Sequence, residues 1–236
     1  MLGNLYNQIL YEPIYKFLVF LYNNIPGHDL GIVIIILTLL IRIILFPLAQ
    51  KAIKSQMRMS LFKDQIKDIQ TKYKSKEEQS RELMKFYKEN KINPFSGCLP
   101  IIVQLPILLA LYRVFINVLN PQNGLLLGHS FLGIIDLSVP SPILAILAGV
   151  SQFFASRLAM KRTPSMPQPG ASDKAMNTQR AMSKQMAYFF PIITVFIAWK
   201  FPAGLAFYWV VSTLLGLIQD YYLYNKYGHR TNQKNN

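Results

Sequence analysis

The sequence is poor in cysteine, histidine and acidic residues, and each shortage excludes a class of protein. Cys98 is the single cysteine, so no intramolecular disulfide can form. The three histidines, His28, His129 and His229, are far apart in the sequence, so we expect no metal and no other cofactor. Asp and Glu number 11 against 25 Lys and Arg, which gives a formal net charge of +14.

Charged residues of either sign are also scarce. They make up 15% of the chain, whereas hydrophobic residues make up 52%. A soluble domain usually carries about a quarter charged residues. Nucleic-acid binding would explain a basic excess, but it does not explain long apolar runs. The composition therefore predicts a membrane protein with basic loops on one side of the bilayer and no sequence-specific nucleic-acid binding.

Five apolar segments are predicted to cross the bilayer as helices. About 20 helical residues cross the hydrocarbon core, and Pro202 and Gly204 mark a tight turn between the last two segments. The predicted spans are residues 30–48, 98–116, 142–158, 187–200 and 203–222. The predicted fold class is all-α, a polytopic membrane protein with a bundle of five transmembrane helices.

Basic residues gather in alternate connections between these spans. Segment 51–91 holds 12 Lys and Arg and segment 157–184 holds six, whereas segment 117–141 holds none. The positive-inside rule then places the N-terminus outside and the C-terminus in the cytoplasm. The predicted domains are an extracytoplasmic segment 1–29, a core 30–222 and a short basic cytoplasmic tail 223–236.

Three segments outside the spans carry further signals. In residues 12–24 we predict a helix that starts at Pro13 and is too short to cross the bilayer. We expect this amphipathic helix to lie on the outer membrane surface or to pack on the bundle. Segment 52–91 has apolar stripes at helical spacing around a turn near 74–76, which predicts a cytoplasmic helical hairpin. The cytoplasmic loop 159–186 holds five of the nine methionines, which suit either an adaptable client surface or packing near the membrane.

Arg42 lies inside the first predicted span, in "LTLLIRIILFPLAQ" (37–50). A charge at this depth is costly, and Asp220 is the only acidic residue within any predicted span. Two interpretations remain open: the side chain reaches along its helix to the cytoplasmic interface, or it faces a hydrated groove and serves a ligand. The polar residues that would line such a groove are Thr38, Gln104, Gln152, Trp209 and Ser212.

The positions of the histidines and acidic residues argue against an enzyme. An intramembrane protease needs a nucleophile with a histidine or paired aspartates, and the predicted spans offer neither. A small anion channel or transporter that uses Arg42 is one alternative function, and a structural assembly factor is another. A proton-coupled transporter is not favoured, because such proteins usually carry intramembrane acids.

Four stretches together resemble the YidC-type membrane protein insertases, a family with mitochondrial and chloroplast relatives. They are "YEPIYKFLVFLYNNIPGHDLG" (11–31), "TLLIRIILFPLAQKAIKSQ" (38–56), "YKENKINPFSGCLPIIVQLPILLALYRVF" (87–115) and "FPAGLAFYW" (201–209). The chain is similar to the minimal five-span form of the family. The resemblance implies a multi-pass protein of the bacterial plasma (inner) membrane with a hydrophilic groove open to the cytoplasm and to lipid. Arg42 matches a groove position of the family, and Gln152 and Trp209 match two others.

The resemblance also implies a mechanism. A client membrane protein with an acidic tail enters the groove, Arg42 draws the tail inward, and the apolar segment moves into lipid along the third and fifth spans. No nucleotide is hydrolysed, and the protein works alone or with the Sec translocon. The hairpin would contact clients or the ribosome through its lysines, Lys63, Lys67, Lys72, Lys74 and Lys76.

Overall fold

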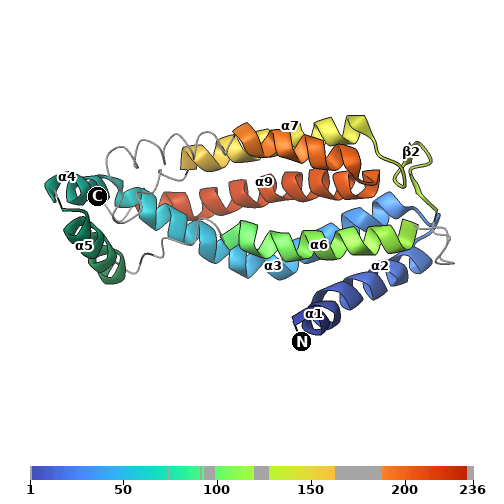
Figure 1. Ribbon diagram of the computed structural model, residues 1–236, viewed down its shortest axis with the longest axis horizontal. Helices are drawn as coiled ribbons and strands as arrows, with labels where there is room; N and C mark the ends of the chain where they lie inside the picture. The colour runs from blue at the N-terminus through green and yellow to red at the C-terminus, as the bar shows by residue number, and fades with distance from the viewer. Residues whose placement is uncertain are drawn as a thin grey trace. The chain divides into compact units, whose positions relative to one another are not determined.

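The described part of the chain consists of helices and one small β-ribbon (Figure 1). The structure, a computed structural model, describes residues 2–73, 75–90, 92, 99–119, 128–162 and 188–232. The elements are α1 (Leu2–Tyr6), the π-helical segment η1 (Asn7–Tyr11), α2 (Glu12–Asn24), α3 (Leu30–Leu61), α4 (Lys63–Lys72), α5 (Lys76–Glu89), α6 (Leu99–Leu119), β1 (Ser130–Phe131), β2 (Ile135–Asp136), α7 (Pro142–Arg162), a helix at Tyr188–Lys200, and α9 (Ala203–Asn232).

The chain divides into two compact units, and five helices contribute to both: α3, α6, α7, the helix Tyr188–Lys200 and α9. The bundle unit comprises Met1–Phe46, Ile101–Gln152 and Pro191–Ile218. The hairpin unit comprises Pro47–Pro100, Phe153–Phe190 and Gln219–Asn236.

Four helices are long and apolar enough to cross a membrane, and the helix Tyr188–Lys200 is shorter. This confirms the predicted all-helical, multi-pass membrane fold. Four helices continue past their predicted ends: α6 to Leu119 and, by more residues, α3 to Leu61, α7 to Arg162 and α9 to Asn232. In the last three the apolar run ends before the helix does, because polar residues at the membrane surface sustain a helix as well as apolar ones do.

The core of the bundle unit draws buried side chains from α2, α3, α6, α7, the helix Tyr188–Lys200 and α9. Tyr208, Phe115 and Leu18 are among its largest fully buried side chains, and they come from α9, α6 and α2. Other large apolar side chains point outward, with Ile44 73% and Phe196 68% exposed. Outward apolar surface on this scale suits lipid as the surrounding medium.

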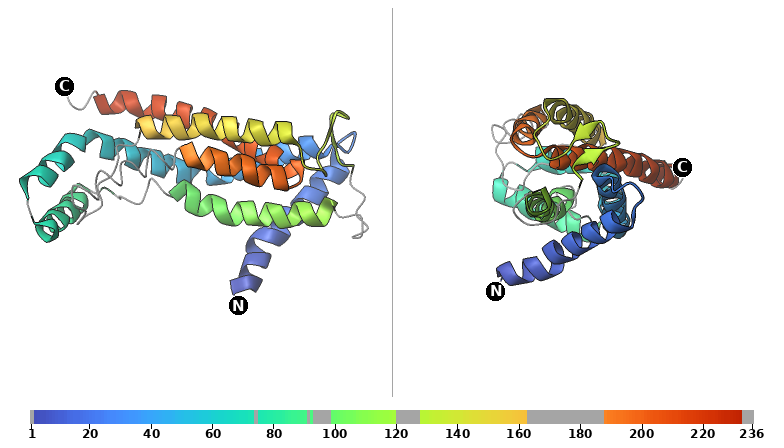
Figure 2. Two further views of the ribbon diagram at one scale, coloured as in Figure 1. Left: turned by 45° about the horizontal axis from the view of Figure 1, so that its top comes forward. Right: turned by 90° about the vertical axis from the view of Figure 1, so that its right-hand side faces the viewer.

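A two-stranded ribbon lies where α3 and α9 begin, and the sequence did not predict it (Figure 2). Phe131 pairs with Ile135 in antiparallel register. Asp29 caps α3, since its Oδ1 accepts the Ile32 N–H at 2.9 Å and its Oδ2 accepts the Leu132 N–H. The Asp29 carboxylate therefore connects the start of α3 to the ribbon.

The N-terminal helical stretch starts earlier than predicted. Helix begins at Leu2 and continues through η1 and α2 to Asn24, whereas the sequence predicts it from Pro13. Leu18 and Tyr22 are buried in the core, so α2 packs on the bundle. In Figure 2 this stretch runs obliquely to α6. Packing on the bundle is confirmed, and a position on the membrane surface stays a prediction.

In the hairpin unit, α4 and α5 flank residues 73–75, where the sequence predicts the turn. The predicted hairpin starts at residue 52, but α3 is continuous until Leu61 because no glycine or proline interrupts that stretch. Phe62 and Phe86 meet edge to face at 5.5 Å between ring centroids. The buried cluster of this unit consists of Met59, Ile66, Leu83, Tyr87 and Ile92. Most of the predicted loop 159–186, including four of its methionines, lies outside the described residues.

Candidate functional site

Arg42 of α3 reaches across to α9. Its Nη2 atom donates to the backbone carbonyl of Ser212 at 2.5 Å and to the Ser212 hydroxyl at 3.2 Å. The side chain is half-buried. A hydrogen bond from a charged donor stabilises by about 1.5–3 kcal/mol, which offsets part of the cost of placing a charge there. The side chain therefore contacts a neighbouring helix instead of only following α3 toward the interface.

Gly216 makes this contact possible. A Cβ atom at position 216 would lie 2.6 Å from Arg42 Nη2 and 3.0 Å from both Cζ and Nη1. Gly216 lies one helical turn after Ser212, so its missing side chain exposes the backbone that the guanidinium approaches. We call Ser212 and Gly216 together the arginine recess. Sequence reasoning missed Gly216 because a small residue in a membrane helix usually indicates helix packing.

A buried tyrosine extends the polar contacts along the same side of α9. Tyr208 is 2% exposed, and it lies one turn before Ser212. Its hydroxyl accepts a hydrogen bond from Gln104 Nε2 of α6 at 2.8 Å and also bonds the Ser212 side chain. Tyr208, which was not predicted, thus connects residues that were predicted for the site: Gln104, Ser212 and, through Ser212, Arg42. The spacing of Tyr208, Ser212 and Gly216 at four-residue intervals was the available signal.

Gln152 and Trp209 form a second polar pair. The indole Nε1 of Trp209 donates to Gln152 Oε1 of α7 at 3.3 Å, and both side chains are half-buried. Trp209 follows Tyr208 directly, and successive helical residues point about 100° apart. The pair therefore lies on a different side of α9 from the arginine recess.

Thr38 lies in the wall of the bundle rather than on an open polar surface. It is 1% exposed, and its hydroxyl donates to the carbonyl of Ile34 in its own helix at 2.6 Å. This bond occupies the hydroxyl proton, so Thr38 offers little to a ligand in this arrangement.

The hairpin lysines are distributed unevenly over the described residues. Lys67 and Lys72 are exposed on α4, and Lys72 Nζ lies 5.6 Å from the ring centroid of Tyr73. Lys63 and Lys76 are the first residues of α4 and α5, and Lys74 lies outside the described residues. The arrangement supplies exposed cations near the turn.

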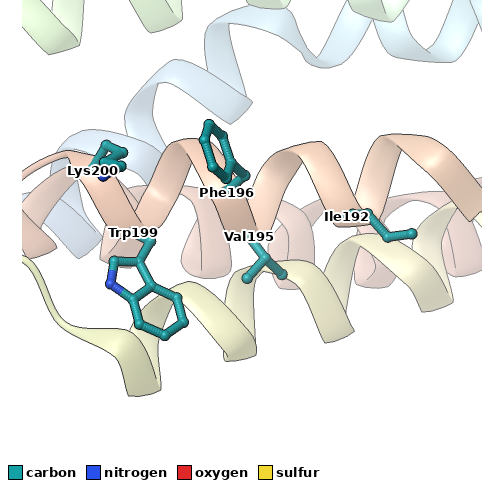
Figure 3. Close-up of a pocket in the computed structure, with 5 residues that line it drawn as sticks. All are labelled: Ile192, Val195, Phe196, Trp199 and Lys200. Atoms are coloured by element: carbon teal, nitrogen blue, oxygen red, sulfur yellow. The ribbon is translucent and has the colours of Figure 1, made fainter.

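An apolar hollow lies on the surface of the helix Tyr188–Lys200. Figure 3 shows that Val195 and Trp199 point toward one side of this helix, and Phe196 toward another. The hollow contains none of the predicted site residues; its lining is Ile192, Val195, Phe196, Trp199 and Lys200. With a single charged group at its end, it suits contact with apolar chains rather than chemistry.

The chemistry available in this site is that of hydrogen-bond donors and one cation. Within the described ranges, no three His, Cys, Asp or Glu side chains lie close enough to hold a metal ion. The residues around Arg42 can attract and orient an anionic group in an apolar setting.

Comparison with known proteins gives a consistent result. The sequence profile of the family described as 60Kd inner membrane protein matches residues 20–230. The membrane protein insertase YidC 1 of Lactococcus lactis is 38% identical over 95% of this chain and 77% of its own length. The membrane protein insertase YidC of Clostridium tetani is 37% identical over 87% of this chain and 86% of its own, and that of Fusobacterium nucleatum is 36% identical over 92% and 98%.

A solved structure agrees with the sequence relatives. The crystal structure of an active YidC insertase, with its first transmembrane domain resolved, superposes with a TM-score of 0.61 at 28% identity. The match covers 92% of this chain and 46% of the solved chain. The chain therefore belongs to the 60Kd inner membrane protein family, that of the YidC membrane protein insertases, which are not enzymes.

Proposed function

We propose that this insertase receives the acidic tail of a client membrane protein at Arg42 and releases the apolar segment sideways into lipid. Arg42 gives the tail's carboxylate a charged partner within the membrane. Moving the carboxylate out of water therefore costs less free energy. A carboxylate and a guanidinium form hydrogen bonds that are about twice as strong as neutral ones. No nucleotide is hydrolysed in this scheme.

The observation that carries the proposal is the arginine recess. Ser212 and Gly216 hold a half-buried guanidinium against the backbone of α9. Holding one nitrogen of the fork in place reduces the side-chain entropy that an incoming carboxylate must immobilise. Arg42 is therefore preorganised to bind an anionic group.

The remaining polar residues support a hydrophilic groove beside Arg42, open to the cytoplasm and to lipid. Gln104 and Tyr208 extend the polar contacts from the recess, and Gln152 and Trp209 add a second pair. Amide and hydroxyl groups of this kind replace part of the hydration of a passing polar tail. Thr38 contributes to the packing of the wall.

Apolar surface on α7 and α9 would guide the client's hydrophobic segment. Ile146 and Val150 of α7 are exposed, as are Leu214 and Ile218 of α9. A client helix on these faces contacts side chains as apolar as lipid, so leaving for the bilayer costs little.

We further propose that the N-terminus lies outside the bacterial plasma membrane and the C-terminus in the cytoplasm. The basic residues of segments 51–91 and 157–184 support this orientation. The hairpin then faces the cytoplasm, where exposed Lys67 and Lys72 would contact clients or the ribosome. A Sec translocon would be a further partner for larger clients.

Reconstitution in liposomes tests the insertion scheme. The client is a single-span protein with an acidic translocated tail, paired with a version whose tail is neutral. Arg42→Gln should slow insertion of the acidic client, while Lys200→Gln, which also removes one cation from the bundle unit, should insert at the wild-type rate. No insertion by the pure wild-type protein would refute independent insertase activity. Anion flux without insertion would instead support a channel.

Thiol labelling tests the orientation. In a Cys98→Ser background, Lys76→Cys should react with a membrane-impermeant probe only from the cytoplasmic side. Ile134→Cys, at a position 84% exposed in the ribbon region, should react only from outside. Reversed labelling of the two positions would refute the proposed topology.

A further inference from the structure

Arg113 occupies an unusual place on α6. Exposed apolar side chains recur along one stripe of this helix, at Ile102, Leu105, Leu109 and Ile116. Arg113 is exposed and falls on the same stripe, because it follows Leu109 by four residues and precedes Ile116 by three. A cation therefore lies on the face of α6 that otherwise suits lipid chains.

The N-terminal helix supplies polar partners opposite this cation. Arg113 Nη1 donates to Asn7 Oδ1 at 3.3 Å, and Asn117 Nδ2 donates to the Tyr11 hydroxyl. Each helix contributes two residues spaced by four, so the two polar rows face one another across an open pocket. The pocket is lined by Asn7, Tyr11, Arg113, Ile116 and Asn117.

The local backbone is adapted to this pocket. Asn7 and Tyr11 are the first and last residues of η1, where the helix widens into a π-helical turn. Such turns are rare and are frequent at functional sites. Tyr6, just before η1, lies with its ring 5.4 Å from the Arg113 guanidinium carbon and donates to the Pro106 carbonyl at 3.3 Å. These contacts fix the N-terminal helix beside α6.

The pocket has a positive charge to satisfy. The contacts of Arg113 in the described residues are with a neutral amide and an aromatic ring. Glu12 is the one acidic residue in η1 and α2, and its Oε2 atom pairs with Lys16 Nζ at 3.0 Å. A guanidinium flanked by amide and hydroxyl groups is suited to an oxyanion such as a phosphate.

We propose that this pocket binds the phosphate of an anionic phospholipid. Arg113 and the Asn117 and Asn7 amides hold the headgroup, while the acyl chains lie along the exposed stripe of α6 from Leu109 toward Ile102. The position suits a headgroup, because Arg113 lies six residues before the end of α6, about 9 Å along the helix axis.

The apolar stripe favours lipid over soluble phosphate as the source. A free phosphate would use only the polar half of the site, whereas a phospholipid also covers the exposed leucines and isoleucines of α6. Basic pockets between membrane helices bind anionic headgroups by this combination of contacts. In the proposed topology the lipid belongs to the outer leaflet.

Native mass spectrometry of the detergent-solubilised protein tests the proposal. Phosphatidylglycerol is titrated into wild type, Arg113→Gln, Arg113→Lys and Lys16→Gln. Arg113→Gln should weaken the tightest phosphatidylglycerol site about fivefold, which corresponds to about 1 kcal/mol per basic residue near a lipid surface. Arg113→Lys should keep most of the affinity. Lys16→Gln removes an exposed cation that is already paired and should bind as wild type does.

A second variant guards against misfolding of Arg113→Gln. Asn117→Asp keeps the arginine but places a carboxylate beside it, so it should weaken the same site at least as much. Equal weakening in Arg113→Gln and Lys16→Gln would show a general charge effect and overturn the proposal. Inorganic phosphate that binds as well as phosphatidylglycerol would overturn the assignment to lipid. Unchanged affinity in both Arg113→Gln and Asn117→Asp would overturn the site itself.

Discussion

Replacing Gly216 with alanine should displace the Arg42 guanidinium from α9 while leaving α9 intact. The added Cβ would lie 2.6 Å from Arg42 Nη2, whereas ordinary contact begins at 3.4 Å. The end of a flexible side chain must therefore move by about 0.8 Å, the difference between these two distances. Because the side chain moves more easily than the helix backbone, the bond to the Ser212 carbonyl should be lost.

The expected size follows from the bond that is lost. A hydrogen bond from a charged donor is worth about 1.5–3 kcal/mol. If the whole amount appears in the barrier to insertion, the rate falls about 10- to 150-fold. Alanine is favoured over glycine within a helix by about 0.5–1 kcal/mol, which offsets part of the lost hydrogen bond, so the free energy of unfolding should fall by no more than about 2.5 kcal/mol. Gly216→Ala should thus slow insertion while the protein still folds.

The assay is the initial rate of insertion of the acidic-tailed client into proteoliposomes, with thermal unfolding measured in parallel. Gly204→Ala is the matched control, because it is the same change in the same helix and its Cβ would approach no neighbour closer than 3.5 Å. In an Arg42→Gln background, Gly216→Ala should have no further effect. Wild-type rates for Gly216→Ala, or an equal loss with and without Arg42, would refute the reasoning.

Three further predictions concern other contacts within the described residues. Ser212→Ala removes the 3.2 Å bond to Arg42 and the bond to the Tyr208 hydroxyl but keeps the 2.5 Å carbonyl bond, so insertion should slow about two- to fivefold, as expected for about 0.5–1 kcal/mol. Gly149→Ala would place a Cβ 2.2 Å from Val195 Cγ2, so unfolding should require about 1–3 kcal/mol less, and Val195→Ala should restore part of the loss in a thermal melt. Burial raises the pKa of the Tyr87 hydroxyl above 10.0, so the neutral form stabilises the hairpin below pH 10 and this contribution is lost as pH rises through the folded pKa. Hydrogen exchange of α4 and α5 amides should show this loss in wild type and a smaller one in Tyr87→Phe.

The family and the order of the membrane helices could be predicted from the sequence. Apolar runs of bilayer length are a strong signal, and the four stretches around them point to the YidC insertases, which the comparisons confirm. The ends of α3 and of the N-terminal helix could not be predicted as well. Helix ends depend on caps and tertiary packing, such as the burial of Leu18 and Tyr22, which leave no clear pattern in one sequence.

Of the contact between Arg42 and α9, only the arginine could be predicted from the sequence. Arg42 is conspicuous because it is a charge within an apolar run. Its partner is a backbone carbonyl, which every residue has, and the determinant of access is the absence of a side chain at Gly216. Sequence patterns register which side chains are present, so an interaction between a side chain and a bare helix backbone escapes them.

Arg42 and Arg113 share one kind of hydrogen bond, which helps to explain how two charged side chains are accommodated in one apolar bundle unit. Each guanidinium is hydrogen-bonded to a neutral oxygen of a second helical segment, the Ser212 carbonyl for one and the Asn7 amide for the other. A neutral acceptor fixes the direction of the guanidinium without adding negative charge, so the contact itself does not compete with an anion. The difference between the two sites lies in their surroundings. Arg42 is half-buried against α9 and suits a carboxylate in transit, whereas Arg113 lies on an exposed apolar stripe and suits a resident lipid phosphate.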